Sequence, residues 1–200
     1  MIMSAGEIWR RWTVGPTYVQ ARYGTARGFV RLAIADLDRR RGTFNVFEDV
    51  DWGVVRRLVF VCSGNICRSP YAEARTRAYG WQTASFALRG IGSLPADPAA
   101  LTAAARRGID LVPHRSTALK DFRALPGDLL LAMEPWQAWS LCTAFPACQV
   151  SLLGLWSRSR RAHLHDPHTL IAAYFDTCFS HIDSATEKLT RLSPGAAGGG

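Results

Sequence analysis

The sequence predicts an α/β fold, a three-layer sandwich around a four-stranded parallel sheet. Two observations lead to this prediction. From residue 57 onward, short apolar runs alternate with helical stretches, an order typical of strand–helix–strand units. The chain also has 200 residues, 48% of them hydrophobic, which is enough for one domain with a buried core. Helices that alternate with parallel strands cover the sheet on both faces.

Short apolar runs mark the predicted strands. The first, Leu58–Val61, is a continuous apolar run, as expected for a strand buried on both faces. It leads directly into a polar loop. The other strands are predicted at 82–88, 129–132 and 150–153.

A helix is predicted after each strand. The stretch 71–79 ends at Gly80, and the Ala-rich stretch 97–107 ends at Gly108. Glycine commonly follows the last residue of a helix, so both ends are well marked. The remaining helices are predicted at 136–143 and 169–192.

The chain divides into an extension, a domain and a tail. Residues 55–193 hold the α/β pattern, whereas residues 1–54 form an N-terminal extension of unknown role. Its stretch 22–41 has apolar residues near helical spacing and predicts an amphipathic helix. This extension could cover the domain, mediate self-association or touch a membrane surface. Residues 194–200 are rich in glycine and are expected to form a disordered tail.

Composition excludes several classes of protein. The net charge of +8 is spread evenly without a basic block, so we expect no nucleic-acid partner. No apolar stretch approaches the roughly 20 residues that cross a bilayer, so no transmembrane segment is expected. The first residues also lack the apolar core of a signal peptide. Five cysteines without regular spacing indicate a reducing compartment, and we expect a cytoplasmic protein.

The segment after the first strand has the pattern of an anion-binding loop. Cys62 and Arg68 enclose five residues between a strand end and a helix start, where unpaired backbone N–H groups face one side. Gly64 permits positive φ, Asn65 tolerates the left-handed region, and Pro70 suits the first helical turn. We therefore predict a phosphate loop that binds a tetrahedral oxyanion through consecutive residues, namely Ser63, Gly64, Asn65, Ile66, Cys67, Arg68 and Ser69.

Cys62 is the predicted nucleophile of this loop. Amide donors, a helix N-terminus and a guanidinium all favour a thiolate over a thiol. The planar fork of Arg68 can hold two phosphoryl oxygens at once, and Ser69 can donate a hydrogen bond to the sulfur. We expect no metal and no cofactor, because these groups already complement the phosphoryl charge. The pattern G-x-x-x-x-G-K-[ST] of nucleoside triphosphatases is absent.

The segment Val61–Pro70 resembles, throughout its length, the signature of the low-molecular-weight protein tyrosine phosphatase family. The resemblance continues over about residues 56–192, including the stretches around Pro95, Gly108 and Met133. It implies phosphomonoester hydrolysis through a cysteinyl-phosphate intermediate, with protein tyrosine dephosphorylation as the activity. The implied partner is a phosphotyrosine protein or another phosphomonoester.

The resemblance also implies the general acid. Asp166, followed by Pro167, matches the loop that carries this group in the family, which makes Cys62, Arg68 and Asp166 the catalytic residues. The residues alone leave open a plain Asp-Pro turn before a helix. A carboxylic acid near the site can protonate the leaving oxygen and then deprotonate water.

Further roles come from the same resemblance. His114 is implied to hold the loop rigid together with Asn65, Ser69 and Ser85. Cys67 is implied to form a reversible disulfide with Cys62 that protects the nucleophile from irreversible oxidation. Metal binding by this pair of cysteines is not expected, because no second pair offers the usual spacing.

The sequence departs from the family pattern at three places, one of them a pair of residues. Ile91 and His168 stand where the family often has an aromatic ring, and Phe86 with Ala87 replaces an Ala-Gly pair. Stacking on an aryl phosphate is therefore open, and so is a phosphoester other than phosphotyrosine.

Two other functions compete with a phosphatase. Arsenate reductases share the fold and the loop, and Cys142 and Cys148 have a spacing that could relay electrons. However, Met133-Glu134 stands where a reductase has its first relay cysteine, and Cys142 and Cys178 are expected to be core residues. The second alternative is a non-catalytic phosphate-binding module, which the combination of Cys62, Arg68 and Asp166 disfavours.

Overall fold

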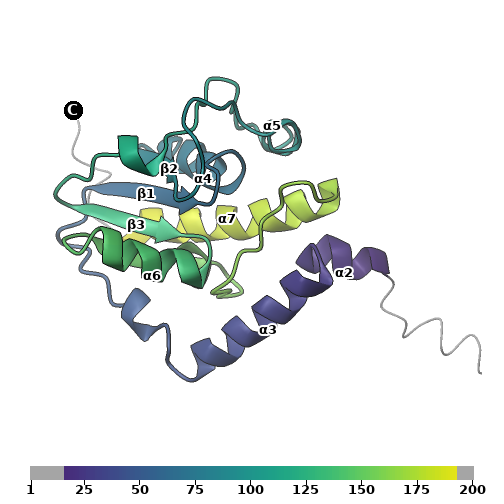
Figure 1. Ribbon diagram of the computed structural model, residues 1–200, viewed down its shortest axis with the longest axis horizontal. Coiled ribbons are helices and arrows are strands. Elements are labelled where there is room, and N and C mark those ends of the chain that lie inside the picture. Colours follow the sequence, from purple (N-terminus) through teal and green to yellow (C-terminus); the bar gives the residue numbers. More distant parts are fainter. Residues whose placement is uncertain (1–15, 193–200) are drawn as a thin grey trace, which may run out of the picture.

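The sheet has the predicted size and direction. The computed structural model describes residues 16–192 (Figure 1). It has four strands, whose neighbours all pair in parallel in the order β2-β1-β3-β4. Their bounds are β1 Arg57–Cys62, β2 Thr83–Ala87, β3 Asp128–Ala132 and β4 Gln149–Leu152. Because all strands run in one direction, their carboxyl ends share one edge, and Cys62 ends the central strand β1 there.

Helices cover both faces of the sheet, which confirms the three layers. Leu58 and Phe60 of β1 pack into one hydrophobic cluster, and Val59 and Val61 pack into a second. This alternation follows from the two-residue repeat of a strand. The first cluster is closed by α4 (Arg68–Arg77), α5 (Pro98–Ala105) and α7 (Ala172–Leu192), and the second by α6 (Pro135–Ala144).

Local caps set the helix boundaries near the site. The Oδ1 of Asp97 accepts hydrogen bonds from the backbone nitrogens of Ala99 and Ala100 at 2.9 and 3.1 Å, which starts α5. Helix α7 begins at Ala172, later than the predicted residue 169. The reason is that Thr169 has a φ of 63°, outside the helical region.

The extension forms two helices, of which the second confirms most of the helix predicted over 22–41 and the first was not predicted. They are α2 (Pro16–Tyr23) and α3 (Ala26–Arg40), and the break falls at Gly24, whose φ is +78°. Glycine adopts this backbone without strain, and Thr25 then caps α3 by accepting a hydrogen bond from the backbone nitrogen of Gly28 at 2.9 Å. Figure 1 shows α2 next to the start of α7, and α2 and α7 are in contact.

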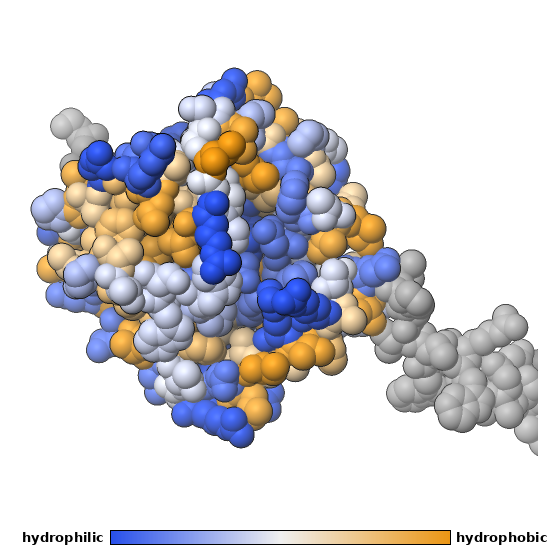
Figure 2. All heavy atoms as spheres, in the orientation of Figure 1, coloured by the Kyte–Doolittle hydropathy of each residue, from blue (hydrophilic) through white to orange (hydrophobic). Residues whose placement is uncertain are grey.

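Part of the extension covers the domain. Phe44 and Phe47 lie next to and within the short helix η1 (Asn45–Phe47) and are buried in the second cluster. The outer face of α3 is different: Val30, Ile34 and Leu37 are 51%, 56% and 48% exposed, and hydrophobic surface follows this helix in Figure 2. Self-association through the extension stays a prediction. The predicted tail at 194–200 lies outside the described residues.

Among the helices of residues 16–192, none has the length and apolar character needed to span a bilayer.

Candidate active site

The thiol of Cys62 is enclosed by the loop that follows it. Cys62 ends β1 and Arg68 begins α4, so residues 63–67 connect the two elements. The sulfur accepts a hydrogen bond from the backbone nitrogen of Asn65 at 3.2 Å and lies 3.0 Å from the Oγ of Ser69. Asn65 has a φ of 53°, the left-handed backbone that asparagine tolerates. The loop therefore presents donors around the sulfur at a helix N-terminus, as an oxyanion site requires.

A glycine allows a neighbouring loop to press against this one. A Cβ atom on Gly90 would lie 2.8 Å from the Cβ of Ala87 and 3.0 Å from the backbone of Gly64. The backbone nitrogens of Leu88 and Arg89 donate to the carbonyl oxygens of Cys62 and Ser63 at 2.9 and 3.0 Å. The chain after β2 thus holds the start of the loop.

Asn65 is the centre of a buried hydrogen-bond network. Its Nδ2 donates to the Oγ of Ser69 at 2.8 Å and to the Oγ of Ser85 at 2.7 Å. The Nε2 of His114 lies 2.7 Å from the carbonyl oxygen of Asn65, and this nitrogen must carry the hydrogen because a carbonyl only accepts. The structure thus places all four predicted supporting residues in one network. Ser85 in turn donates to Glu73 at 2.5 Å, a partner that sequence reasoning missed.

Arg68 is completely buried and lies between two carboxylates. Its Nη1 donates to the Oε1 of Glu134 and to the carbonyl oxygen of Leu164, both at 2.7 Å. Its Nη2 lies 2.9 Å from the Oδ2 of Asp166. Within the described residues, Nε and Nη2 donate no well-aligned hydrogen bond. Buried donors of this kind are rare in folded proteins, and here they match what an oxyanion needs.

The charges of Arg68 and Glu134 stabilise each other. Burial would lower the pKa of Arg68, but Asp166 and Glu134 raise it overall, so the guanidinium stays charged. Burial would also raise the pKa of Glu134, but Arg68 lowers it below its usual range. Glu134 receives a further hydrogen bond from the Nε1 of Trp136 at 3.1 Å. The site therefore contains a fixed, ionised pair.

Asp166 lies on a loop that is tied to the end of β3 and that carries two histidines. Its side chain is 40% exposed, in contrast to Arg68. The backbone nitrogen of Leu164 donates to the carbonyl oxygen of Met133 at 2.9 Å, which ties this loop to the end of β3. Burial lowers the pKa of His163 to about 4 and also lowers that of His165, so both rings are neutral near pH 7.

The neutral His163 makes the fold sensitive to acid. Between pH 6.5 and about 4 the unfolded chain binds a proton at this residue that the folded chain does not, so the free energy of unfolding falls on acidification. At pH 5 this amounts to about 2 kcal/mol, or roughly 4–8 °C in Tm. His163→Leu is expected to lose less stability between pH 7 and pH 5. Thermal unfolding of both proteins at pH 7 and pH 5 measures this. Burial also lowers the pKa of His181 to about 4, and this residue contributes equally to the acid sensitivity of both proteins. Equal acid sensitivity would contradict the prediction.

The three departures from the family pattern lie in different surroundings. The Nδ1 of His168 is 3.2 Å from the Oδ2 of Asp97, so this ring bridges the acid-bearing loop to the start of α5. Ile91 is 68% exposed. Phe86 is buried in the second cluster and stacks on Phe122 with ring centroids 4.2 Å apart, so its size serves the core.

The cysteines separate into two groups. Cys62, Cys67 and Cys178 belong to the first cluster, whereas Cys142 and Cys148 pack against the second, on the other face of the sheet. All five are free. Cys178 is buried, as expected of a core residue, and Cys142 is partly buried. A relay from Cys62 to Cys142 would have to cross the sheet, which disfavours a reductase.

One group of side chains has metal-ligating atoms close together. The ligand atoms of Cys67, Asp97 and His168 lie within 4.8 Å of one another. However, Asp97 already caps α5, and burial, with a contribution from Asp97, raises the pKa of the Cys67 thiol. Because Asp97 and His168 already have partners among the described residues, we assign no metal to this group.

Sequence reasoning missed the residues that support the phosphate loop from a segment far along the chain. Glu134, Trp136 and Gln137 follow β3, and the Nε2 of Gln137 lies 3.2 Å from the Oγ of Ser63. The available signal was their position: the carboxyl ends of neighbouring parallel strands form one edge, so polar residues after β3 lie beside those after β1.

A thiol inside an anion-binding loop, at the carboxyl end of a parallel strand, defines the class of phosphate-loop enzymes with a cysteine nucleophile. Comparison with known proteins narrows this class. The sequence profile described as low molecular weight phosphotyrosine protein phosphatase matches residues 57–193. The chain therefore belongs to the low-molecular-weight protein tyrosine phosphatase family, as its sequence predicted.

Individual relatives agree with this membership. The chain is 29% identical over 136 residues to a probable low molecular weight protein-tyrosine-phosphatase, EpsP, of Ralstonia nicotianae, covering 67% of this chain and 93% of the relative. It is 30% identical over 135 residues to the phosphatase Etp of Escherichia coli K12, covering 66% and 90%. The crystal structure of the tyrosine phosphatase AmsI of Erwinia amylovora superposes with a TM-score of 0.62 at 26% identity, covering 70% of this chain and 94% of AmsI.

Proposed function

We propose that this protein removes the phosphoryl group from phosphotyrosine residues of proteins, with Cys62, Arg68 and Asp166 as its catalytic residues. Family membership and the names of the relatives support the reaction class. The observation that carries the residue roles is the pairing of an enclosed Cys62 thiol with a buried Arg68. Among the described residues its Nε and Nη2 make no well-aligned hydrogen bond, and Nη2 lies 2.9 Å from the carboxyl group of Asp166.

In the first step the sulfur of Cys62 attacks phosphorus, and the bond to the ester oxygen breaks. The loop amides and Arg68 hold the other phosphoryl oxygens, whose charge grows in the transition state. Asp166, in its acid form, gives its proton to the departing phenolate oxygen. The products are the free tyrosine hydroxyl and a phosphoryl group on sulfur.

In the second step water attacks phosphorus, and the sulfur leaves as thiolate. Asp166, now a carboxylate, takes the proton from this water and so returns to its acid form. The Oγ of Ser69, 3.0 Å from the sulfur, can donate a hydrogen bond to the leaving thiolate. The network of Asn65, Ser85 and His114 keeps the loop in one shape through both steps.

The two competing functions have less support. The reductase alternative needs a cysteine relay, and Cys142 packs on the opposite face of the sheet from Cys62. The binding-module alternative explains neither the ionisable group of Asp166 at 2.9 Å from Arg68 nor the hydroxyl of Ser69 beside the thiol.

The pH dependence of kcat/KM tests the role of Asp166. With para-nitrophenyl phosphate, the wild type is expected to have an acidic optimum, because the general acid must be protonated. Asp166→Asn is expected to lose this optimum and to be slower by about 10²–10⁴-fold. An unchanged pH profile would remove Asp166 from its role. Thioredoxin-linked arsenate reduction by the same preparation would instead indicate the reductase.

Oxidation tests the role of Cys67. Peroxide converts the Cys62 thiolate to a sulfenic acid, and the Cys67 thiol then attacks it, releasing water and forming a disulfide. Mild peroxide is therefore expected to inactivate the wild type, and added thiol to restore activity. The Cys67→Ser variant is expected to regain a smaller share of its activity when thiol is added after peroxide. Equal recovery of both proteins, with no intermolecular products, would contradict this role.

We also propose the division into an extension at 1–54 and a catalytic domain at 55–193, acting in a reducing compartment such as the cytoplasm. The family match over 57–193 supports the boundary, and the five free cysteines support the compartment.

A further inference from the structure

The N-terminal extension reaches the loop that carries Asp166. Here "the arm" denotes α2 and α3 together, residues 16–40, and "the acid loop" denotes residues 161–170. The Oγ1 of Thr25 lies 3.2 Å from the Nε2 of His165, the residue before Asp166. This hydroxyl already accepts from the backbone nitrogen of Gly28, so its own hydrogen is free to be donated to the neutral ring.

Two glycines of the arm make close packing on His165 possible. A Cβ atom at Gly28 would lie 2.7 Å from the Cδ2 of His165, and one at Gly24 would lie 2.9 Å from it. Real Cβ atoms essentially never approach other atoms this closely, so a side chain at either position would force a shift. At Gly28 it would meet the backbone oxygen of Tyr23 as well as the ring, and at Gly24 the side chain of Leu170 as well as the ring. The arm thus forms a closely packed binding surface for the imidazole of His165.

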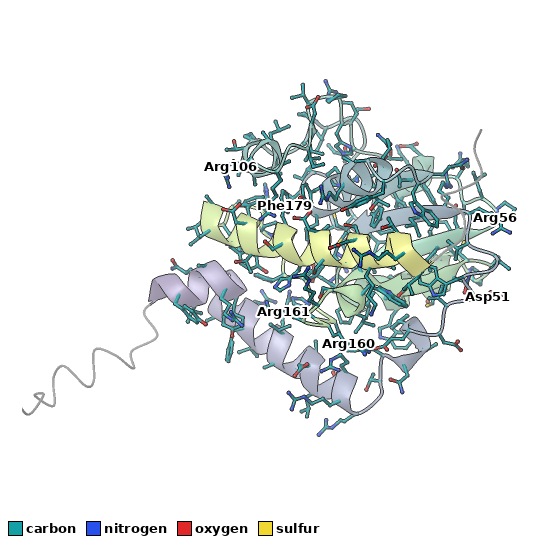
Figure 3. The ribbon with its side chains drawn as sticks, turned by 180° about the vertical axis from the view of Figure 1, so that it is seen from behind. Asp51, Arg56, Arg106, Arg160, Arg161 and Phe179 are labelled. Carbon is teal, nitrogen blue, oxygen red and sulfur yellow. The ribbon has the colours of Figure 1, made fainter. Side chains whose placement is uncertain are left out.

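The arm is itself fixed to the domain at other points. The Oγ1 of Thr177 in α7 donates to the carbonyl oxygen of Ala21 at 2.7 Å. The guanidinium of Arg161 lies 5.8 Å from the ring centroid of Tyr23, and Figure 3 shows Arg161 between α7 and the arm. The Nη1 of Arg31 is 4.0 Å from the Oε2 of Glu134. The surface of the arm that packs on His165 is therefore fixed to the domain through Thr177, Arg161 and Glu134.

Asp166 depends on its neighbours for its position. Its carboxylate is 40% exposed and has two polar neighbours among the described residues, Arg68 at 2.9 Å and the backbone nitrogen of His168 at 3.3 Å. The preceding residue, His165, has two contacts. Its carbonyl oxygen accepts a hydrogen bond from the hydroxyl of Tyr174 at 3.3 Å, and its ring contacts the hydroxyl of Thr25. The residue before it, Leu164, is also held, through its nitrogen by Met133 and through its carbonyl oxygen by Arg68. Removing the contact with Thr25 therefore leaves the His165 ring without its hydrogen-bond partner among the described residues, while the backbone before Asp166 keeps its other supports.

We propose that the arm is a positioning element for the general acid, acting through the contact of Thr25 with His165. This inference rests on the proposed role of Asp166. The arm lies outside the residues 57–193 that match the family, so this support is an addition of this chain to the shared site. A carboxyl group held in place transfers its proton without first having to be ordered, so its loss slows the reactions that need the acid.

The leaving group separates this role from a merely structural one. A phenol of low pKa departs without a proton, whereas a phenol of high pKa requires the acid. Thr25→Val is therefore expected to lower kcat/KM for phenyl phosphate about fivefold, the effect of one neutral hydrogen bond, and to leave 2,4-dinitrophenyl phosphate unchanged within twofold. Asp166→Asn is expected to show the same selectivity with a larger loss.

Matched variants complete the test. Thr25→Ser keeps the hydroxyl and is expected to behave as wild type. Ile34→Ala, on the exposed face of the same helix, is expected to do so as well. In a double-mutant cycle, Thr25→Val is expected to have no further effect once His165→Leu has removed the acceptor. Should Thr25→Val fail to fold, His165→Leu alone is expected to show the selectivity.

Each outcome decides the proposal. A loss that is equal for both substrates in Thr25→Val, or no loss at all, while Asp166→Asn remains selective, overturns the role of the arm and leaves that of Asp166 intact. If Asp166→Asn itself shows no selectivity, the general acid is another group, and the proposals for Asp166 and for the arm both fall.

Discussion

Cys62→Ser is expected to abolish turnover of para-nitrophenyl phosphate, with a fall in kcat of about 10⁴–10⁶-fold. A serine hydroxyl is not ionised near neutral pH and is a much weaker nucleophile than a cysteine at the same place. The substitution replaces one sulfur by one oxygen, so the backbone donor of Asn65 and the hydroxyl of Ser69 keep a polar partner. The loss therefore reports the chemistry of the sulfur.

Phosphate binding provides the control for this loss. Titration calorimetry with inorganic phosphate is expected to give a Kd for Cys62→Ser within a few-fold of the wild type, because Arg68 and the loop amides remain. Rapid quenching of the wild type during turnover is expected to trap one phosphoryl group per chain on the sulfur of Cys62. The same quenching of the Cys62→Ser variant is expected to trap none. Turnover by Cys62→Ser above 1% of wild type would show that another group attacks phosphorus.

Much of the fold was readable from local signals. The apolar run at 58–61 and the loop pattern from Cys62 to Pro70 each depend on residues adjacent in the chain, and both lie where they were predicted. The helix predicted over 22–41 is confirmed for Ala26–Arg40 and is wrong only at its start, for a local reason. Gly24 has a positive φ, so α2 ends before it and α3 begins after it.

The supporting contacts of the site were not readable in this way. Arg68 meets Glu134 across 66 residues of chain, and Thr25 meets His165 across 140. Such pairs follow from the order of strands and from how the extension packs, neither of which has a local pattern. The shared edge of β1 and β3 was the one general rule that could have pointed to Glu134.

Glu134→Ala is expected to lower the free energy of unfolding by about 3–5 kcal/mol, the cost of breaking a buried ion pair by removing one partner. Arg68 is fully buried, and Glu134 is 4% exposed. Without Glu134, the guanidinium keeps one carboxylate partner among the described residues, the half-exposed Asp166 at 2.9 Å from Nη2. We therefore also expect a lower kcat/KM, since Arg68 loses the partner that fixes its orientation. Urea unfolding at pH 7 measures the first effect and aryl phosphate kinetics the second.

The stability that Glu134 contributes depends on pH. Because the folded pKa of Glu134 lies below its ordinary value, its contribution is complete at neutral pH and disappears as the pH falls through that lowered value. The difference between wild type and Glu134→Ala should therefore shrink on strong acidification. Asp36→Ala is the matched control, because Asp36 pairs with Arg39 and Arg40 at the surface of α3, where such pairs contribute within about 1 kcal/mol. If Glu134→Ala were as stable as Asp36→Ala at pH 7, the charge of Arg68 would not need a buried carboxylate, and another group would have to hold the guanidinium beside Cys62.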